Sequence, residues 1–92
     1  MKPFRWSHEK NEQLKAERNI SFEEIVLAIE AGGLLNIVAH TNPRKYPHQR
    51  MCIVAVEQYV YLVPFVEEAD YYFLKTAIPN RKATREYLKG GV

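Results

Sequence analysis

Cysteine is nearly absent from this 92-residue chain, and the single one, Cys52, lies in the apolar run 51–56. One cysteine excludes an internal disulfide and a cysteine-rich zinc site. Its apolar surroundings predict a buried, unreactive thiol. Three histidines, together with the lack of any Asp or Glu between residues 31 and 56, do not form a zinc ligand set either. We therefore expect no metal and no cofactor.

Long apolar segments are also missing. The longest uncharged stretch, residues 31–43, is too short and too polar to span a bilayer, and the first residues lack the apolar core of a signal peptide. We therefore expect a cytoplasmic protein with no membrane partner. The chain has no repeats, low-complexity tracts or linkers, and 47% of its residues are hydrophobic, which predicts a single domain over residues 1–92.

Acidic residues are scarce in two segments of the chain. Residues 40–50 hold three cations and no acid, and residues 75–92 hold five cations with Glu86 as their one acid. The remainder holds five cations and ten acids, so the formal net charge of +2 hides a strong separation of charge. We expect the two basic segments to converge on one cleft that attracts a polyanion.

Hydrophobic periodicity predicts three helices and five strands. The helices are expected over residues 8–18, over residues 22–31 before a glycine pair, and over residues 81–89 before a second glycine pair. The strands are expected over residues 4–6, 34–40, 49–56, 59–66 and 71–78. Short connections make the last four strands an antiparallel meander. The predicted fold class is therefore α+β: a small antiparallel sheet with two N-terminal helices on one face and a short basic helix at its end.

Particular residues mark the ends and interruptions of these elements. Ser7, Ser21 and Asn80 stand where a helix N-cap is expected. Glu24 completes a capping box with Ser21. Pro64 lies inside a predicted strand and calls for a bulge or a gap in its ladder, while the apolar strand over residues 49–56 is expected to be interior.

The C-terminal helix is expected to be cationic on one face and anchored on the other. Arg81, Lys82 and Arg85 share one side, whereas Ala83 and Tyr87 lie opposite and can pack inward. With so few acids nearby, salt bridging within the helix cannot be its purpose. This pattern favours phosphate binding; the alternative is a solvated terminal helix.

Several segments together resemble a known family. They are Phe4 to Trp6, Glu9 to Asn11, Ile20 to Glu24, His40, Asn42-Pro43, Lys45 to Pro47, Val63 to Val66, and the block from Phe73 to Thr84. In this combination, which covers nearly the whole chain, the sequence resembles BrnT-type toxins of bacterial toxin–antitoxin pairs. Those toxins commonly open with Trp-Asp where this chain has Trp6-Ser7. Serine also caps a helix, but any role of that carboxylate is missing here.

The resemblance implies a RelE-like fold and a metal-independent endoribonuclease that cleaves messenger RNA and inhibits translation. It also implies a cognate antitoxin protein, encoded beside the toxin and often carrying a DNA-binding domain. Operator DNA would then be bound only through that antitoxin. The polar first helix, which is expected to lie on the surface, is our predicted docking element for the antitoxin.

Cleaving RNA without a metal requires a proton to leave the 2′-hydroxyl, a proton to reach the leaving 5′-oxygen, and stabilisation of the charge on the phosphorane. Histidine, tyrosine, lysine and arginine can do this work. Our catalytic candidates are His40, Tyr46, His48, Lys75 and Arg81, and our RNA-binding candidates are Arg44, Lys45, Arg50, Lys82, Arg85 and Tyr87.

Each candidate also has a structural interpretation. His40 follows an apolar strand and is equally consistent with a core histidine whose ring is hydrogen-bonded. Tyr46 can stack on a splayed base or plug its loop against the sheet. Lys75 can bind phosphate or simply extend from the sheet edge into solvent. For the whole chain, a non-catalytic RNA- or partner-binding module of the same fold is the alternative, and a gyrase-poisoning toxin is a third possibility.

Overall fold

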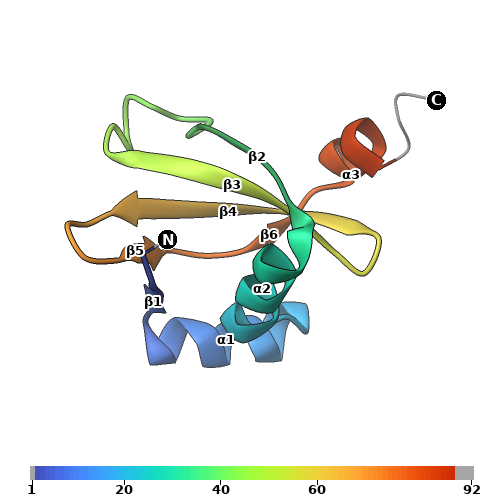
Figure 1. Ribbon diagram of the computed structural model, residues 1–92, viewed down its shortest axis with the longest axis horizontal. Coiled ribbons are helices and arrows are strands. Elements are labelled where there is room, and N and C mark those ends of the chain that lie inside the picture. Colours follow the sequence, from blue (N-terminus) through green and yellow to red (C-terminus); the bar gives the residue numbers. More distant parts are fainter. Residues whose placement is uncertain (1, 89–92) are drawn as a thin grey trace.

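Helices and strands begin and end close to where the sequence predicts them. The computed structural model describes residues 2–88. The elements, in chain order, are β1 (Phe4–Trp6), α1 (His8–Arg18), α2 (Phe22–Ala28), the π-helical turn η1 (Ile29–Gly33), β2 (Leu34–Ala39), β3 (Gln49–Val56), β4 (Tyr59–Glu67), β5 (Tyr72–Leu74), β6 (Ile78–Pro79) and α3 (Arg81–Leu88) (Figure 1). Lys89 and the glycine pair expected to end the last helix lie outside the described residues.

All three predicted N-caps are confirmed. The Ser7 hydroxyl accepts a hydrogen bond from Lys10 N at 3.2 Å, and the Ser21 hydroxyl accepts one from Glu24 N at 3.1 Å. The Asn80 side chain accepts one from Ala83 N at 2.7 Å. Each bond satisfies a backbone donor that the first helical turn leaves without a partner.

Two glycines end the second helix, as predicted. Gly32 adopts φ = 95°, a left-handed conformation that is unstrained only for glycine. At Gly33 the reason is space, because an added Cβ would lie 2.6 Å from Ala55 O and 2.7 Å from Ala28 O. The chain therefore turns tightly here and passes from α2 into β2.

The sheet is mixed, in the order β1-β5-β4-β3-β2, with β6 pairing separately with β4. Consecutive strands from β2 to β5 pair antiparallel, but β1 pairs parallel with β5. The expectation of a wholly antiparallel sheet is therefore wrong at this edge. The short N-terminal strand carries no signal for its direction, which is set by how α1 and α2 return the chain across the sheet. Strand β3 is interior, as expected.

Pro64 breaks the ladder between β4 and the segment after β5, as predicted. Lys75 N donates to Pro64 O at 2.8 Å, but proline has no N–H to return the bond. Strand pairing stops at Phe65↔Leu74 and resumes at Leu62↔Ile78, so residues 75–77 lie opposite only Val63 and Pro64. The continuous strand expected over residues 71–78 is thus two strands joined by a bulge with one extra residue.

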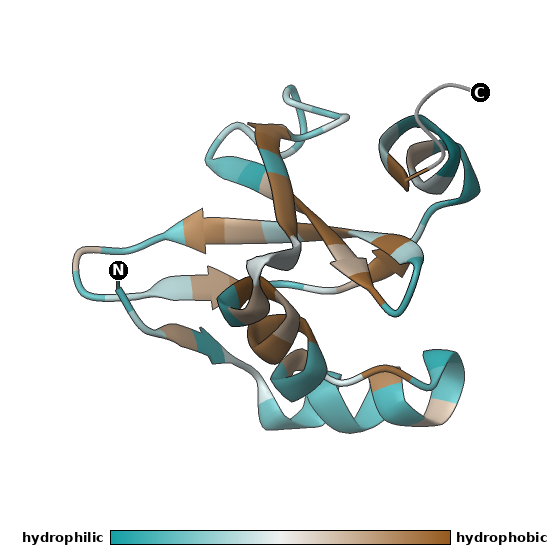
Figure 2. Ribbon diagram, turned by 45° about the vertical axis from the view of Figure 1, so that its right-hand side comes forward, coloured by the Kyte–Doolittle hydropathy of each residue, from teal (hydrophilic) through white to brown (hydrophobic). Residues whose placement is uncertain are grey.

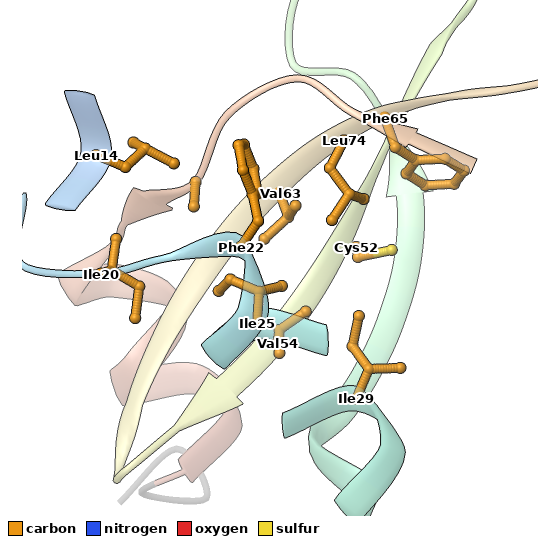
Figure 3. Close-up of a cluster of buried hydrophobic side chains, with 11 residues drawn as sticks. Leu14, Ile20, Phe22, Ile25, Ile29, Cys52, Val54, Val63, Phe65 and Leu74 are labelled. Carbon is orange, nitrogen blue, oxygen red and sulfur yellow. The ribbon is translucent and has the colours of Figure 1, made fainter. Parts of the chain in front are cut away.

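The main hydrophobic core lies between the sheet and the first two helices. Buried side chains from α1 and α2 point toward those of β3, β4 and β5, including Leu14, Phe22, Cys52, Val63 and Leu74 (Figure 3). The helix α1 is hydrophilic over most of its length (Figure 2). Leu14, its one large apolar side chain, is only 2% exposed. Thus α1 lies on the surface and contributes a narrow apolar contact.

Helix α3 covers part of the opposite face of the sheet. A second buried cluster joins Ala83 to Ile53 and Val60, which point away from the main core because strand side chains alternate between faces. The Thr84 hydroxyl accepts a hydrogen bond from Val60 N at 2.9 Å and donates one to Asn80 O at 2.8 Å. The third helix is therefore anchored on a face of the sheet, near the β3–β4 turn.

Among residues 2–88, no helix combines the length and the apolar character that crossing a membrane requires.

Candidate functional site

A pocket of about 380 Å³ opens on the part of the sheet that α3 leaves uncovered. Gln49 and Pro64 lie at its base and point to the same face as Ile53 and Val60, following the alternation of side chains along β3 and β4. The lining residues come from four segments distant in sequence: Lys10, His40, Tyr46, Gln49, Pro64, Lys75, Thr76 and Ile78. We call this hollow the sheet pocket.

The loop between β2 and β3 brings His40 and Tyr46 into the sheet pocket. Asn42 organises the loop: its backbone oxygen accepts from Tyr46 N at 3.0 Å, and its side-chain oxygen accepts from Lys45 N at 3.4 Å. Asparagine followed by Pro43 is typical of the first two positions of a β-turn. The loop is thus held in a turn by its own residues.

His40 is half-buried, with its ring 4.5 Å from the Tyr46 ring centroid to centroid. Its Nδ1 accepts a hydrogen bond from Asn42 N at 2.9 Å. A neutral imidazole has one N–H, so this bond leaves the proton on Nε2 and makes that atom a donor. The expected hydrogen-bonded ring is present, and it lines an open pocket.

Tyr46 has neighbours on its ring that restrict base stacking. The His40 ring packs against it, and Lys45 Nζ lies 5.4 Å from its ring centroid. Both contacts occupy the ring from within its own loop, which favours the alternative in which Tyr46 holds its loop against the sheet. Stacking of a base on Tyr46 is therefore no longer our expectation.

Lys75 belongs to the bulge between β5 and β6, which gives its backbone an orientation that a regular strand would not. Its side chain is exposed and lines the sheet pocket, with Nζ 5.3 Å from the Phe73 ring centroid. The bulge thus presents a cation beside His40 and Tyr46. The sequence predicts Lys75 as a candidate. The bulge that carries it was indicated only by the break in strand pairing expected at Pro64.

Arg18 holds this bulge, a role that was not predicted from the sequence. From the last turn of α1, its Nη1 donates to Ala77 O at 2.8 Å and lies 3.5 Å from Thr76 Oγ1. Ala77 O is a carbonyl that the interrupted ladder leaves available. In the sequence, Arg18 is one charged residue among several in a polar helix. Such a residue gives no signal that it holds a distant segment.

A second hollow, of about 310 Å³, lies at the other end of the sheet. Arg81 and Arg85, four residues apart on α3, line it together with Gln58, Tyr59 and Thr84. Both arginines are exposed, and within residues 2–88 neither forms an ion pair. We call this hollow the arginine hollow. The strand position of Tyr59 is typical of a core aromatic residue, but its side chain is 36% exposed at this site.

The two basic segments meet only at Lys75, because the other described cations of the second segment lie on α3, so the expectation of a single cleft is wrong. The loop after β2 lies at one end of the sheet and α3 at the other (Figure 1). The strand register agrees, because Gln49 pairs with Val66 whereas α3 is bonded to Val60. Sequence charge alone could not reveal this, because the position of α3 depends on packing against a distant strand.

Arg50 lies outside both hollows, contrary to its expected RNA contact. It follows Gln49 in β3 and therefore points to the opposite face of the sheet. There it forms an ion pair with Glu67 at 2.8 Å and packs on the Phe65 ring, with Cζ 5.3 Å from the centroid. This ion pair holds the guanidinium on the face away from both hollows, so Arg50 does not contribute to either of them.

The other candidates are dispersed. Arg44, Lys45, His48 and Lys82 are exposed and line neither hollow. Tyr87, expected to pack inward, is 38% exposed, and its hydroxyl accepts from Asn36 Nδ2 at 3.1 Å. This bond ties α3 to β2. Ala83, also expected to pack inward, is buried as predicted.

Cys52 has the environment expected of an unreactive thiol. It is 4% exposed in the main core, and burial raises its pKa to about 11. Little thiolate is present near neutral pH at such a pKa. Within residues 2–88, no three His, Cys, Asp or Glu side chains are grouped so that they could hold a metal ion.

Comparison with protein-family models, with curated proteins and with solved structures finds no match to this chain. The resemblance to BrnT-type toxins therefore depends on the residues named above alone.

Proposed function

We propose that this protein is a metal-independent endoribonuclease with a RelE-like fold, acting as the toxin of a bacterial toxin–antitoxin pair in the cytoplasm. The observation that carries the proposal is the meeting of His40 and Tyr46, from the loop after β2, with Lys75, from the bulge before β6, in the sheet pocket. These residue types can donate or transfer protons and stabilise negative charge without a metal. The reactive phosphodiester is proposed to bind here.

In the proposed reaction the substrate 2′-oxygen attacks phosphorus, and the bond from phosphorus to the 5′-oxygen breaks. The products are a 2′,3′-cyclic phosphate and a free 5′-hydroxyl. Lys75 stabilises the added charge on the phosphorane, and the Tyr46 hydroxyl donates to the leaving oxygen. No carboxylate lines the pocket.

His40 is the base in this scheme, and it must change its tautomer to act. To accept the 2′-hydroxyl proton at Nε2, the His40 ring must carry its own proton on Nδ1. Nδ1 can then no longer accept the hydrogen bond from Asn42 N. A hydrogen bond of this kind contributes about 1 kcal/mol, so the cost is small beside the gain from a positioned base. Binding of the substrate hydroxyl to Nε2 offsets it.

The test is RNA cleavage by purified protein in the presence of EDTA, followed by analysis of the product ends. Cyclic phosphate and 5′-hydroxyl ends support the scheme, whereas dependence on added Mg²⁺ contradicts it. His40→Ala is expected to lower the cleavage rate by roughly 100-fold. His48→Ala is the matched control, because this exposed histidine of the same loop lines neither hollow and should leave the rate unchanged.

The toxin role has its own test. Induced expression should stop growth and translation, and co-expression of the protein encoded beside the gene should restore them. That partner is proposed to be an antitoxin that also provides any contact with operator DNA. RNA binding without cleavage in every condition would favour the non-catalytic module instead.

A further inference from the structure

The arginine hollow is not used by the chemistry proposed for the sheet pocket, yet it has the features of an anion site. Arg81 and Arg85 extend from the same side of α3 because they are one helical turn apart. The guanidinium groups stay charged at any physiological pH and can each hold two phosphate oxygens. The hollow of about 310 Å³ between α3 and the β3–β4 turn leaves room for such a group.

The helix that carries these arginines is held firmly in place. Asn80 N donates a hydrogen bond to Val60 O at 3.0 Å. The Thr84 hydroxyl accepts one from Val60 N at 2.9 Å. Ala83 is 7% exposed against the sheet. An arginine pair on a helix anchored in this way has a fixed position relative to the sheet.

The distance between the two hollows follows from the chain itself. Lys75 and Arg81 are joined by six peptide units, which can span at most about 20 Å. Pro64, in the sheet pocket, and Tyr59, in the arginine hollow, are five residues apart along β4, which corresponds to about 17 Å. One phosphate group cannot contact both hollows.

The segment between the hollows is open to solvent. Ile78 and Pro79 are exposed along β6, and Ile78 lines the sheet pocket. Within residues 75–81 there is no acidic side chain to repel a phosphate backbone. A single-stranded chain leaving the sheet pocket can therefore follow β6 to Arg81.

We propose that the arginine hollow is a distal phosphate subsite, so that the preferred substrate is single-stranded RNA long enough to fill both hollows. This inference deepens the proposed function and depends on it. A dinucleotide has one internucleotide phosphate and can occupy the sheet pocket alone. A longer RNA gains the additional contact with Arg81 and Arg85.

The experiment compares a diadenosine monophosphate with a 12-nucleotide single-stranded RNA as substrates for the full chain. The Arg81→Gln/Arg85→Gln variant is expected to lose about tenfold in kcat/KM on the 12-mer and less than twofold on the dinucleotide. The slope of log kcat/KM against log salt should also become shallower by about 0.7 for each phosphate that this variant no longer neutralises. The matched control, Arg5→Gln/Lys15→Gln, removes the same charge from residues that line neither hollow and should change kcat/KM on the 12-mer by less than threefold.

The outcomes separate the subsite from the proposed catalysis. Equal losses on both substrates, or no loss on the 12-mer, would overturn the subsite. If the unmodified protein cleaves neither substrate, the proposed function fails, and binding of a 2′-O-methyl 12-mer then decides the subsite. A tenfold weaker affinity in the arginine variant alone supports it, and equal affinities for this variant and its control reject it. Melting curves of all variants exclude misfolding as the cause.

Discussion

The two hollows differ in how the protein builds them. The sheet pocket is formed by irregular backbone, namely the loop after β2 and the bulge before β6. The arginine hollow is formed by a regular helix fixed to a strand by hydrogen bonds. The first combines a histidine, a tyrosine and a lysine, whereas the second offers two identical cations. This difference suits the proposed reaction at one end and the proposed retention of an RNA chain at the other.

The largest expected effect is on the rate of RNA cleavage when a cation of the sheet pocket is removed. Replacing Lys75 with alanine removes the cation beside the reacting phosphate and should lower kcat by roughly 100-fold to 1,000-fold, as expected for loss of a group that stabilises the transition state. Single-turnover kinetics with a labelled RNA measures this. Lys82→Ala, an exposed lysine outside both hollows, should stay within threefold; equal rates for the two variants would contradict the assignment of chemistry to the sheet pocket.

Stability should respond more strongly at the arginine end. Thr84→Val removes the acceptor of the buried Val60 N–H, which costs roughly 1–3 kcal/mol of the free energy of unfolding. The melting temperature should fall by about 4–8 °C for each 1 kcal/mol in a domain of this size. Thr84→Ser keeps the hydroxyl and should retain most of the stability. Serine and valine variants of equal stability would show that this bond does not fix α3.

A smaller effect is expected from the support behind the sheet pocket. Arg18→Met keeps the aliphatic stem but removes the donors that hold the bulge at Ala77 O. We expect kcat to fall by about tenfold with KM nearly unchanged, and hydrogen exchange to become faster in residues 75–77. Arg18→Lys should recover part of the rate. Lys15→Met, on the same helix, is the control, and an equal effect in both variants would indicate general damage to α1.

The smallest effect concerns Glu67, which pairs with Arg50 and Lys2 on the face away from both hollows. The hydrogen bond and charge of Lys2, with a smaller contribution from Arg50, lower the pKa of Glu67 below its usual 4.5. Its contribution to stability is therefore present above pH 4.5 and is lost as the pH falls through the lowered value. Urea unfolding of the unmodified protein and of Glu67→Gln should differ slightly at neutral pH and converge in acid. RNA cleavage at neutral pH should be the same for both.

Much of the fold could be predicted because its signals are local. Ser7, Ser21 and Asn80 sit next to the helices they cap, and the glycine pair at Gly32 stands at the turn it permits. Pro64 also indicated the break in its ladder, because a missing N–H has the same consequence in any sheet.

The arrangement of the site could not be predicted in the same way, because it depends on contacts between distant segments. The parallel pairing of β1, the anchoring of α3 on Val60 and the contact of Arg18 with the bulge all join residues far apart in sequence. Charge counts could not decide on which face Arg50 would lie or how far Arg81 would be from His40. Of the five catalytic candidates, His40, Tyr46 and Lys75 lie together in one pocket, and which of them would do so depended on the folding of distant segments.

The most direct test of the central claim is to locate a bound phosphodiester that cannot react. Amide spectra of ¹⁵N-labelled protein, recorded during titration with 2′-O-methyl diadenosine monophosphate, report which residues it contacts. We predict shifts at the amides of His40, Tyr46 and Thr76, with those of residues 81–85 unchanged. Shifts confined to residues 81–85 would contradict the claim that the sheet pocket receives the reactive phosphate.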